Sequence, residues 1–259
     1  MEQELDFARR VAVEAGKMIL TYFSRTLTVD MKGWADPVTA ADRAAETYIR
    51  GEIARAYPDD AMHGEEQGRT AGQSRRTWVI DPLDGTANFA GGMNLFGVVI
   101  TLLEDDRPVM NVTHDPVRLE TFETVRGGGA RLNGEPIRVS DPAPLAGMLI
   151  HMSFPRDKGA WMGSMRLTER ITAVAPHARN IGSSALAQAY VACGRMHAHA
   201  RVQTGEYDIV GGNLMIEEAG GVVTDLCGDP YGPDTKGLLA AAPENHKALL
   251  ALDLAGCLS

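Results

Sequence analysis

The stretch Trp78–Phe89, WVIDPLDGTANF, leads an apolar run directly into two aspartates, a proline, a glycine and a threonine. Burying an ionised carboxylate costs free energy unless a partner compensates it. The pattern leaves three interpretations of Asp81 and Asp84 open: metal ligands, a phosphorylated aspartate, or a solvated turn. If a helix begins at Thr86, the free N–H groups of its first turn form an anion site, although a simple helix cap by Asp84 or Thr86 also fits.

The spacing of the two aspartates argues against a phosphorylated aspartate. Haloacid-dehalogenase-type phosphatases use an Asp-x-Asp pair, and strand alternation places such an i, i+2 pair on one face. Asp81 and Asp84 stand at i, i+3, and Pro82 between them is expected to end the strand. The covalent mechanism is therefore disfavoured.

Further carboxylates occur where regular structure is expected to end. Asp42 begins a predicted helix, Glu65 lies in the segment GEE, and Asp208 precedes another predicted helix. Carboxylate oxygens are the ligands that hard cations prefer. Because Mg²⁺ usually takes one or two carboxylates and borrows phosphate oxygens from its ligand, a dispersed set of this kind indicates metal-assisted phosphoryl chemistry.

Hydrophobic periodicity predicts two lobes. In the first, helices at about 5–22 and 41–56 are expected to pack on an antiparallel sheet that contains an Asn133-Gly134 hairpin. From residue 148 onward strands alternate with helices, which is typical of an α/β lobe. The expected boundary divides an N-terminal α+β lobe, 1–141, from a C-terminal α/β lobe, 142–259, within one catalytic unit.

Composition limits the class of protein. The chain has 259 residues, 44% of them hydrophobic, and a net charge of -9, which argues against a general nucleic-acid binder. The N-terminus lacks a signal-peptide core and no segment approaches the ~18 consecutive apolar residues of a membrane span. The three cysteines are widely spaced and suggest no disulfide framework. We therefore expect a cytoplasmic protein without a membrane or nucleic-acid partner.

Two smaller features bear on packing. Gly211 and Gly212 lie inside a predicted helix, where they cost about 2 kcal/mol relative to alanine, so close packing is expected there. His197 and His199 share one face of a predicted strand, but no third nitrogen or sulfur ligand lies nearby. We therefore expect surface or core histidines rather than a metal pair.

Five segments, in this order, resemble the inositol monophosphatase family of Mg²⁺-dependent, lithium-sensitive phosphatases. They are GEE (64–66), DPLDGTANF (81–89), RGGGARLNG (126–134), IGSSA (181–185) and EYDIVGGNLMIEEAGG (206–221). The resemblance implies a layered αβαβα sandwich of the inositol monophosphatase and fructose-1,6-bisphosphatase type, combining α+β and α/β features, commonly as a homodimer.

The resemblance also implies a metal site. Two Mg²⁺ ions, with a weaker third near Asp42 and with Mn²⁺ as a possible substitute, would be held by Glu65, Asp81, the Leu83 carbonyl, Asp84 and Asp208. Gly85 and Thr86 would hold the phosphate through their N–H groups. Glu65, with Thr86 and Asp42, would orient and deprotonate the attacking water.

The substrate contacts are expected to come from Asp84, Ser184 and Arg201. Inositol-selective members carry a glutamate seven residues before the last metal aspartate, and this chain has Arg201 there. A guanidinium prefers a second phosphate or a carboxylate to neutral hydroxyls. A solvated arginine at a strand end is the alternative interpretation.

The function implied is a Mg²⁺-dependent phosphomonoesterase that hydrolyses inositol 1-phosphate or a related small sugar phosphate. Fructose 1,6-bisphosphate, 3′-phosphoadenosine 5′-phosphate and histidinol phosphate are alternative substrates. A metal-binding regulatory protein on the same scaffold is the non-enzymatic alternative.

Overall fold

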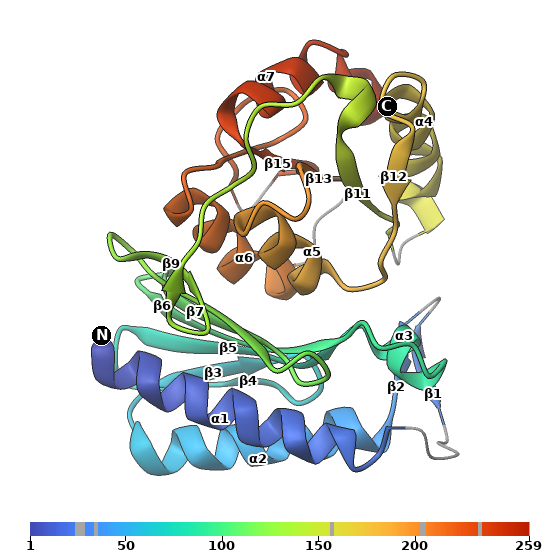
Figure 1. Cartoon of the computed structure of the whole chain (residues 1–259). Coiled ribbons are helices and arrows are strands. Elements are labelled where there is room, and N and C mark those ends of the chain that lie inside the picture. The colour runs from blue at the N-terminus through green and yellow to red at the C-terminus, as the bar shows by residue number, and fades with distance from the viewer. Residues whose placement is uncertain (24–28, 34–35, 156–157, 203–205, 233–234, 259) are drawn as a thin grey trace.

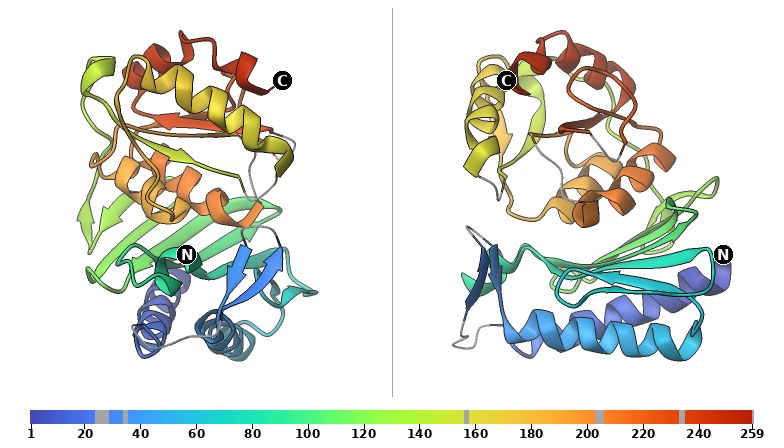
Figure 2. Two further views of the ribbon diagram at one scale, coloured as in Figure 1. Left: turned by 90° about the vertical axis from the view of Figure 1, so that its right-hand side faces the viewer. Right: turned by 180° about the vertical axis from the view of Figure 1, so that it is seen from behind.

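The computed structural model describes residues 1–23, 29–33, 36–155, 158–202, 206–232 and 235–258, without the side chains of 32, 33, 36, 37 and 206–208. Figure 1 shows layers of helix and sheet in alternation, and the two views of Figure 2 show the same order. The outer helices on one side are α1 (Glu2–Leu20) and α2 (Ala40–Ala56). The middle layer holds α5 (Ser184–Ala192) and α6 (Glu206–Glu218), and the far side holds α4 (Trp161–Thr172) and α7 (Pro243–Leu250). The predicted αβαβα sandwich is confirmed.

The first sheet has eight strands among the described residues, in the order β10-β9-β8-β7-β6-β5-β3-β4. Its strands are β3 (Ala61–Gly64), β4 (Gly68–Thr70), β5 (Arg76–Asp84), β6 (Gly97–Glu104), β7 (Arg107–Asp115), β8 (Glu120–Val125), β9 (Gly129–Leu132) and β10 (Glu135–Pro136). The sheet was expected to be antiparallel. It is mixed, because β3 and β5 run parallel. The edge strand β4 runs antiparallel to β3, so the chain has reversed direction before β5 begins and β5 can pair with β3 in parallel.

The second sheet has the order β12-β11-β13-β15-β14 in the described part of the chain. Its strands are β11 (Leu149–Ser153), β12 (His177–Arg179), β13 (Ala198–Val202), β14 (Val222–Thr224) and β15 (Gly237–Ala241). Strand β11 pairs in parallel with both β12 and β13, as the predicted strand–helix alternation requires. The helix α7, the edge strand β4 and a small hairpin of β1 (Asp30–Gly33) and β2 (Asp36–Val38) were not predicted.

Apolar clusters fill the spaces between the layers. One joins α1 and α2 to the first sheet and includes Phe7, Ile49 and Trp78; another joins the second sheet to α4 and α7. A third lies between the sheets, around α5 and α6. The predicted hairpin is present, with Asn133 and Gly134 both at positive φ. Of the described helices, none has the length and apolar character that crossing a bilayer requires.

A buried polar layer lies where α6 meets the first sheet. Thr101 on β6 donates its hydroxyl hydrogen to Asn111 Oδ1 on β7 at 2.9 Å, and both residues are at most 1% exposed. A Cβ added to Gly211 would lie 2.1 Å from Asn111 Oδ1 and 2.3 Å from Thr101 Oγ1. Close packing therefore explains this glycine in the helix interior, as predicted.

Gly211→Ala should destabilise the protein by about 1–3 kcal/mol, because the added methyl group must displace a hydrogen-bonded pair in a packed interior. Gly51→Ala is the matched control, because a Cβ at this exposed helix position would meet nothing within 4 Å. The control should stabilise the protein by about 0.5–1 kcal/mol. Urea denaturation measures both changes, and a neutral Gly211→Ala would contradict the packing argument.

Two buried histidines lie side by side in the second sheet. His151 on β11 and His199 on β13 are 1% and 0% exposed, and their ring centroids are 4.7 Å apart. Burial, together with the Arg201 charge, lowers the pKa of His151 to about 3. Burial, with smaller contributions from His151 and Arg201, holds the pKa of His199 well below its usual value. Both rings are therefore neutral at neutral pH, and both are core histidines.

Acid should destabilise the protein through these rings. In the unfolded chain these histidines have a pKa of about 6.5 and bind protons below that pH, whereas in the folded chain they stay neutral. The free energy of unfolding therefore falls as pH falls. Between pH 7 and pH 5, His151 should account for about 2 kcal/mol of this loss. Urea denaturation at both pH values should therefore show a correspondingly smaller loss for His151→Gln than for the parent chain. An equal loss in the two proteins would refute the assignment.

Candidate active site

A β-bulge places Asp81 and Asp84 on the same face of the first sheet. In the register of β5 and β6, Asp81 opposes Val99 and Asp84 opposes Gly97, so three steps on β5 match two on β6. Val99 and Gly97 share a face, and the residues across from them therefore do too. The expectation that Pro82 ends the strand is wrong, because β5 continues through Pro82 to Asp84. The extra residue of the bulge, rather than a strand end, gives the i, i+3 pair its common direction.

Asp84 is held by the start of α5, which belongs to the middle layer. The Ser183 hydroxyl donates to Asp84 Oδ2, and the Ala185 N–H donates to the same oxygen at 2.9 Å. The Ser184 N–H lies 3.3 Å from Asp84 Oδ1. A carboxylate at a helix N-terminus is stabilised by these donors and by the helix dipole. The side chain, 3% exposed, therefore connects the first sheet with α5.

Thr86 shares one hydroxyl hydrogen between two acceptors. Its Oγ1 lies 3.0 Å from Asp42 Oδ1 and 3.0 Å from the Leu83 carbonyl oxygen. A hydroxyl has a single hydrogen, so it can donate to only one of them at a time. Asp42, at 1% exposure, also accepts the Thr39 N–H at 2.9 Å and the Thr39 hydroxyl. Burial raises the pKa of Asp42, and the hydrogen bonds from Thr39 and Thr86 oppose this rise.

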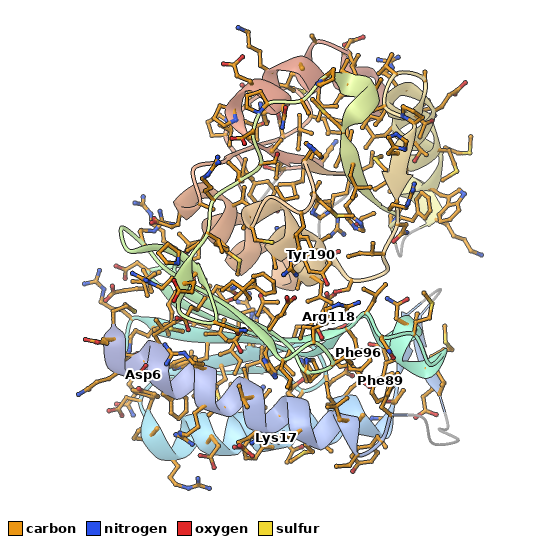
Figure 3. All side chains as sticks on the ribbon, in the orientation of Figure 1. Asp6, Lys17, Phe89, Phe96, Arg118 and Tyr190 are labelled. Carbon is orange, nitrogen blue, oxygen red and sulfur yellow. The ribbon has the colours of Figure 1, made fainter. Side chains whose placement is uncertain are left out.

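Gly85 turns the chain from β5 into the short helix α3 (Thr86–Ala90). Its φ is +97°, and a Cβ there would lie 2.8 Å from the Leu95 carbonyl oxygen. Both the backbone conformation and the space therefore require glycine. Phe89 of α3 packs on Phe96 with ring centroids 5.0 Å apart, and the two are labelled side by side in Figure 3.

Glu65 follows β3, next to the end of β5. Its N–H donates to the Ile80 carbonyl at 3.1 Å, which places it alongside Asp81 on the neighbouring parallel strand. The turn after Glu65 is held by Glu46 of α2. The buried Glu46 carboxylate accepts the Glu66 N–H at 2.7 Å and the Gln67 N–H at 3.0 Å. Glu46 was not predicted as a site residue, because nothing in its local sequence pattern separates it from other helical carboxylates.

Asn88 links α3 to the segment before α5. Its Nδ2 donates to the Leu95 carbonyl and to the Ile181 carbonyl, both at 2.7 Å. A Cβ on Gly182 would lie 2.6 Å from Asn88 Oδ1, so the glycine of IGSSA permits this approach. No local pattern in the sequence identifies Asn88, whereas Ser183 and Thr39 both stand in a recognisable one. Each is a hydroxyl residue immediately before a helix, which is the pattern of an N-cap.

Ser184, whose N–H is directed at Asp84 from the start of α5, is also in contact with Arg201. Arg201 Nη1 lies 3.3 Å from Ser184 Oγ. Arg201 is 7% exposed, which rules out a solvated arginine at a strand end. Asp208 lies in the first turn of α6, but its side chain is outside the described residues. Among the side chains that are described, three or more His, Cys, Asp or Glu residues nowhere gather as a metal cluster.

The residues around the bulge fit a hard divalent cation. The Asp81 and Asp84 carboxylates, 2% and 3% exposed, and the Leu83 carbonyl provide only oxygen donors. Two carboxylates that face the same way with so little exposure favour a bound cation, because burying negative charge costs free energy unless positive charge compensates it. Oxygen donors of this type suit Mg²⁺ or Mn²⁺ rather than zinc. The predicted ligands Asp81, Leu83, Asp84 and Glu65 therefore lie at neighbouring strand ends, with Asp42 and Thr86 beside them.

Residues 1–257 match the inositol monophosphatase family. The chain belongs to this family. It is 38% identical over 240 residues to the Nus factor SuhB of Xylella fastidiosa, covering 89% of this chain and 87% of that protein. It is 36% identical over 245 residues to the inositol-1-monophosphatase of Mesorhizobium japonicum, covering 93% and 92%.

The solved structures show the same fold. The chain superposes on the IMPase of Thermotoga maritima with a TM-score of 0.91 and 30% identity, covering all of both chains. Membership of the family connects the site with phosphatase chemistry. The relatives bear two kinds of name, one for a phosphatase and one for a Nus factor.

Glu46→Gln should weaken Mg²⁺ binding at the site, although Glu46 is not one of the proposed ligands. The amide can accept from only one of the two N–H groups at full strength, which leaves a buried donor unsatisfied at a cost of about 1–3 kcal/mol. The turn that carries Glu65 should then loosen, and the Mg²⁺ concentration needed for half-maximal thermal stabilisation should rise several-fold. Glu52→Gln, on the same helix but bonded only to surface arginines in the described contacts, is the matched control. An unchanged Mg²⁺ requirement in Glu46→Gln would contradict this role.

Proposed function

We propose that the chain is a Mg²⁺-dependent phosphomonoesterase that hydrolyses inositol 1-phosphate or a related small phosphate ester. The observation that carries the proposal is the position of the Thr86 hydroxyl, which lies 3.0 Å from both the Asp42 carboxylate and the Leu83 carbonyl, beside Asp81 and Asp84. A proton acceptor, a hydroxyl and a set of hard-cation ligands thus lie together at one bulge. Family membership supports the same chemistry.

The residues of the chain divide the work between binding and proton transfer. Glu65, Asp81, Asp84, Asp208 and the Leu83 carbonyl would hold two Mg²⁺ ions, with a weaker third ion near Glu65 and Asp42. When bound, such cations lower the pKa of water and offset the charge of the phosphate.

Gly85 and Thr86 would hold the phosphate through N–H groups. The Thr86 hydroxyl, by donating to Asp42, would turn its lone pair toward the attacking water and accept that water's hydrogen bond. Glu65 would take the proton. The site therefore needs no covalent intermediate.

The substrate is best sought in a panel. Arg201, a proposed substrate contact, stands where inositol-selective members have a glutamate, so bisphosphates and acidic esters belong in the panel beside inositol 1-phosphate. Fructose 1,6-bisphosphate, 3′-phosphoadenosine 5′-phosphate and histidinol phosphate are the alternatives. Inhibition by lithium in the millimolar range would support the proposed metal arrangement.

A regulatory role is the second candidate, because the Xylella fastidiosa relative bears the name of a Nus factor. Phosphate release separates the two candidates. If the chain releases no phosphate in the presence of Mg²⁺ from any ester of the panel, the enzymatic proposal fails and the regulatory one is favoured.

Asp42→Asn should lower Mg²⁺-dependent turnover by about 10²–10³-fold, because the amide has one acceptor oxygen and cannot serve both Thr39 and Thr86, so the Thr86 hydroxyl no longer directs its lone pair toward the attacking water. The fold should persist, since the amide oxygen can still accept from Thr39 in the helix cap. Asp6→Asn, a surface change, is the control and should match the parent chain. Steady-state phosphate release and urea denaturation measure the two effects. Parental turnover in Asp42→Asn would eliminate the proposed role.

A further inference from the structure

A second polar network lies behind Ser184, away from the bulge. Ser184 Oγ is 3.4 Å from Ser153 Oγ and 3.3 Å from Arg201 Nη1. Ser153 ends β11 and pairs in register with Arg201 on β13. The Ser184 N–H is directed at Asp84 Oδ1. Ser184 thus connects the proposed metal ligand with the edge of the second sheet.

Both buried histidines converge on Ser153. His151 Nε2 lies 2.9 Å from Ser153 Oγ, and His199 Nε2 lies 3.2 Å from the same atom. Each neutral ring carries one N–H, so the direction of every hydrogen bond depends on which nitrogen holds that hydrogen. The surrounding contacts decide this for each ring.

The backbone sets the hydrogen of His151. We assign the hydrogen of His151 to Nε2, because the Ile181 N–H is directed at Nδ1 from 3.5 Å and makes that nitrogen an acceptor. His151 therefore donates to Ser153 Oγ. The same backbone segment leads into Ser183 and Ser184, which ties the ring to the start of α5.

Burial sets the hydrogen of His199. Its Nδ1 is fully buried and has no hydrogen-bond partner among the described residues. A hydrogen on Nδ1 would be a buried orphan donor, which native structures tolerate less well than an unpaired acceptor. The hydrogen therefore lies on Nε2, and His199 also donates to Ser153 Oγ.

These assignments fix the remaining hydroxyl hydrogens. Ser153 Oγ accepts from both histidines, so its own hydrogen goes to Ser184 Oγ. Ser184 Oγ then accepts from Ser153 and from Arg201, and its hydrogen is directed to a third partner. Ser184 is partly exposed, whereas Ser153, His151 and His199 are buried. The network thus ends at the Ser184 hydroxyl, which acts as a donor, and the positive charge of Arg201 beside it favours a negatively charged acceptor.

We propose that Ser184 donates this hydrogen to an anionic oxygen on the alcohol half of the substrate, and that Ser153, His151 and His199 are positioning residues that fix its direction. The favoured substrates are then phosphomonoesters whose alcohol carries a carboxylate or a second phosphate beside the ester. Ser184 approaches Asp84 from α5, whereas the proposed phosphate donors lie at α3, so the two halves of the substrate meet different elements. This inference rests on the proposed phosphatase function.

A pair of matched esters tests the inference. 2-Phosphoglycerate and glycerol 2-phosphate differ only in a carboxylate that replaces a hydroxymethyl group. The parent chain should prefer 2-phosphoglycerate in kcat/KM, and Ser184→Ala should lower this preference about tenfold or more, the effect of a hydrogen bond to a charged group. The substitution keeps the backbone N–H that binds Asp84. Ser184→Thr should restore most of the preference.

Ser153→Ala tests the positioning role. It should lower the same preference in part, and the double variant Ser153→Ala/Ser184→Ala should lower it no further than Ser184→Ala alone, because the two hydroxyls act as one unit. Ser164→Ala is the matched control, a buried serine of α4 whose hydroxyl has no partner among the described residues. It should keep the parental preference. Equal losses on both esters in Ser184→Ala would place the hydroxyl on the phosphate and overturn the inference.

The tautomers provide a readout that does not depend on activity. ¹⁵N-histidine NMR of the full chain at neutral pH should show hydrogen on Nε2 of both rings, with signals assigned through His151→Gln and His199→Asn. Hydrogen on Nδ1 of His199 would turn the Ser153 hydroxyl inward and overturn this inference alone. Absence of Mg²⁺-dependent phosphate release from both esters would instead overturn the proposed function, and this inference with it.

Discussion

The contact between Asp84 and the start of α5 is the constraint on which the site depends. Asp84 comes from a bulged strand of the first sheet, and its donors come from Ser183, Ser184 and Ala185 in the middle layer. One carboxylate therefore fixes the distance between two layers and is itself oriented by a helix N-terminus. A displacement of α5 would therefore move the Asp84 carboxylate and change the affinity for a cation bound there.

Glycines and buried polar side chains keep the middle layer close to the first sheet. Gly211 allows α6 to approach the Thr101–Asn111 pair, and Gly182 allows the segment before α5 to approach Asn88. Polar groups buried between layers specify a unique arrangement only if their partners are in place. The pairs named here have such partners, so the layers cannot slide without breaking hydrogen bonds that water cannot replace.

The two sides of Asp84 differ in chemistry. The bulge side presents carboxylates, a carbonyl and the Thr86–Asp42 pair, which together suit cations and proton transfer. The α5 side presents Ser184 in front of Arg201, Ser153 and two neutral histidines, which together suit an acceptor oxygen. In the proposed phosphatase mechanism, such a division would separate the reacting phosphate from the alcohol that leaves.

The layered αβαβα arrangement was implied by the resemblance to the inositol monophosphatase family. The sequence by itself determined most of the strands and helices and singled out the acidic residues of the candidate site, because periodicity and hard-ligand chemistry are local properties. It misjudged Pro82, since only the pairing of β5 with β6 shows that the strand continues as a bulge. It missed Glu46 and Asn88, whose partners lie far away in the chain. Tertiary structure alone decided that Arg201 is buried and that His151 and His199 share Ser153, because burial and the direction of a hydrogen bond depend on residues that folding brings together.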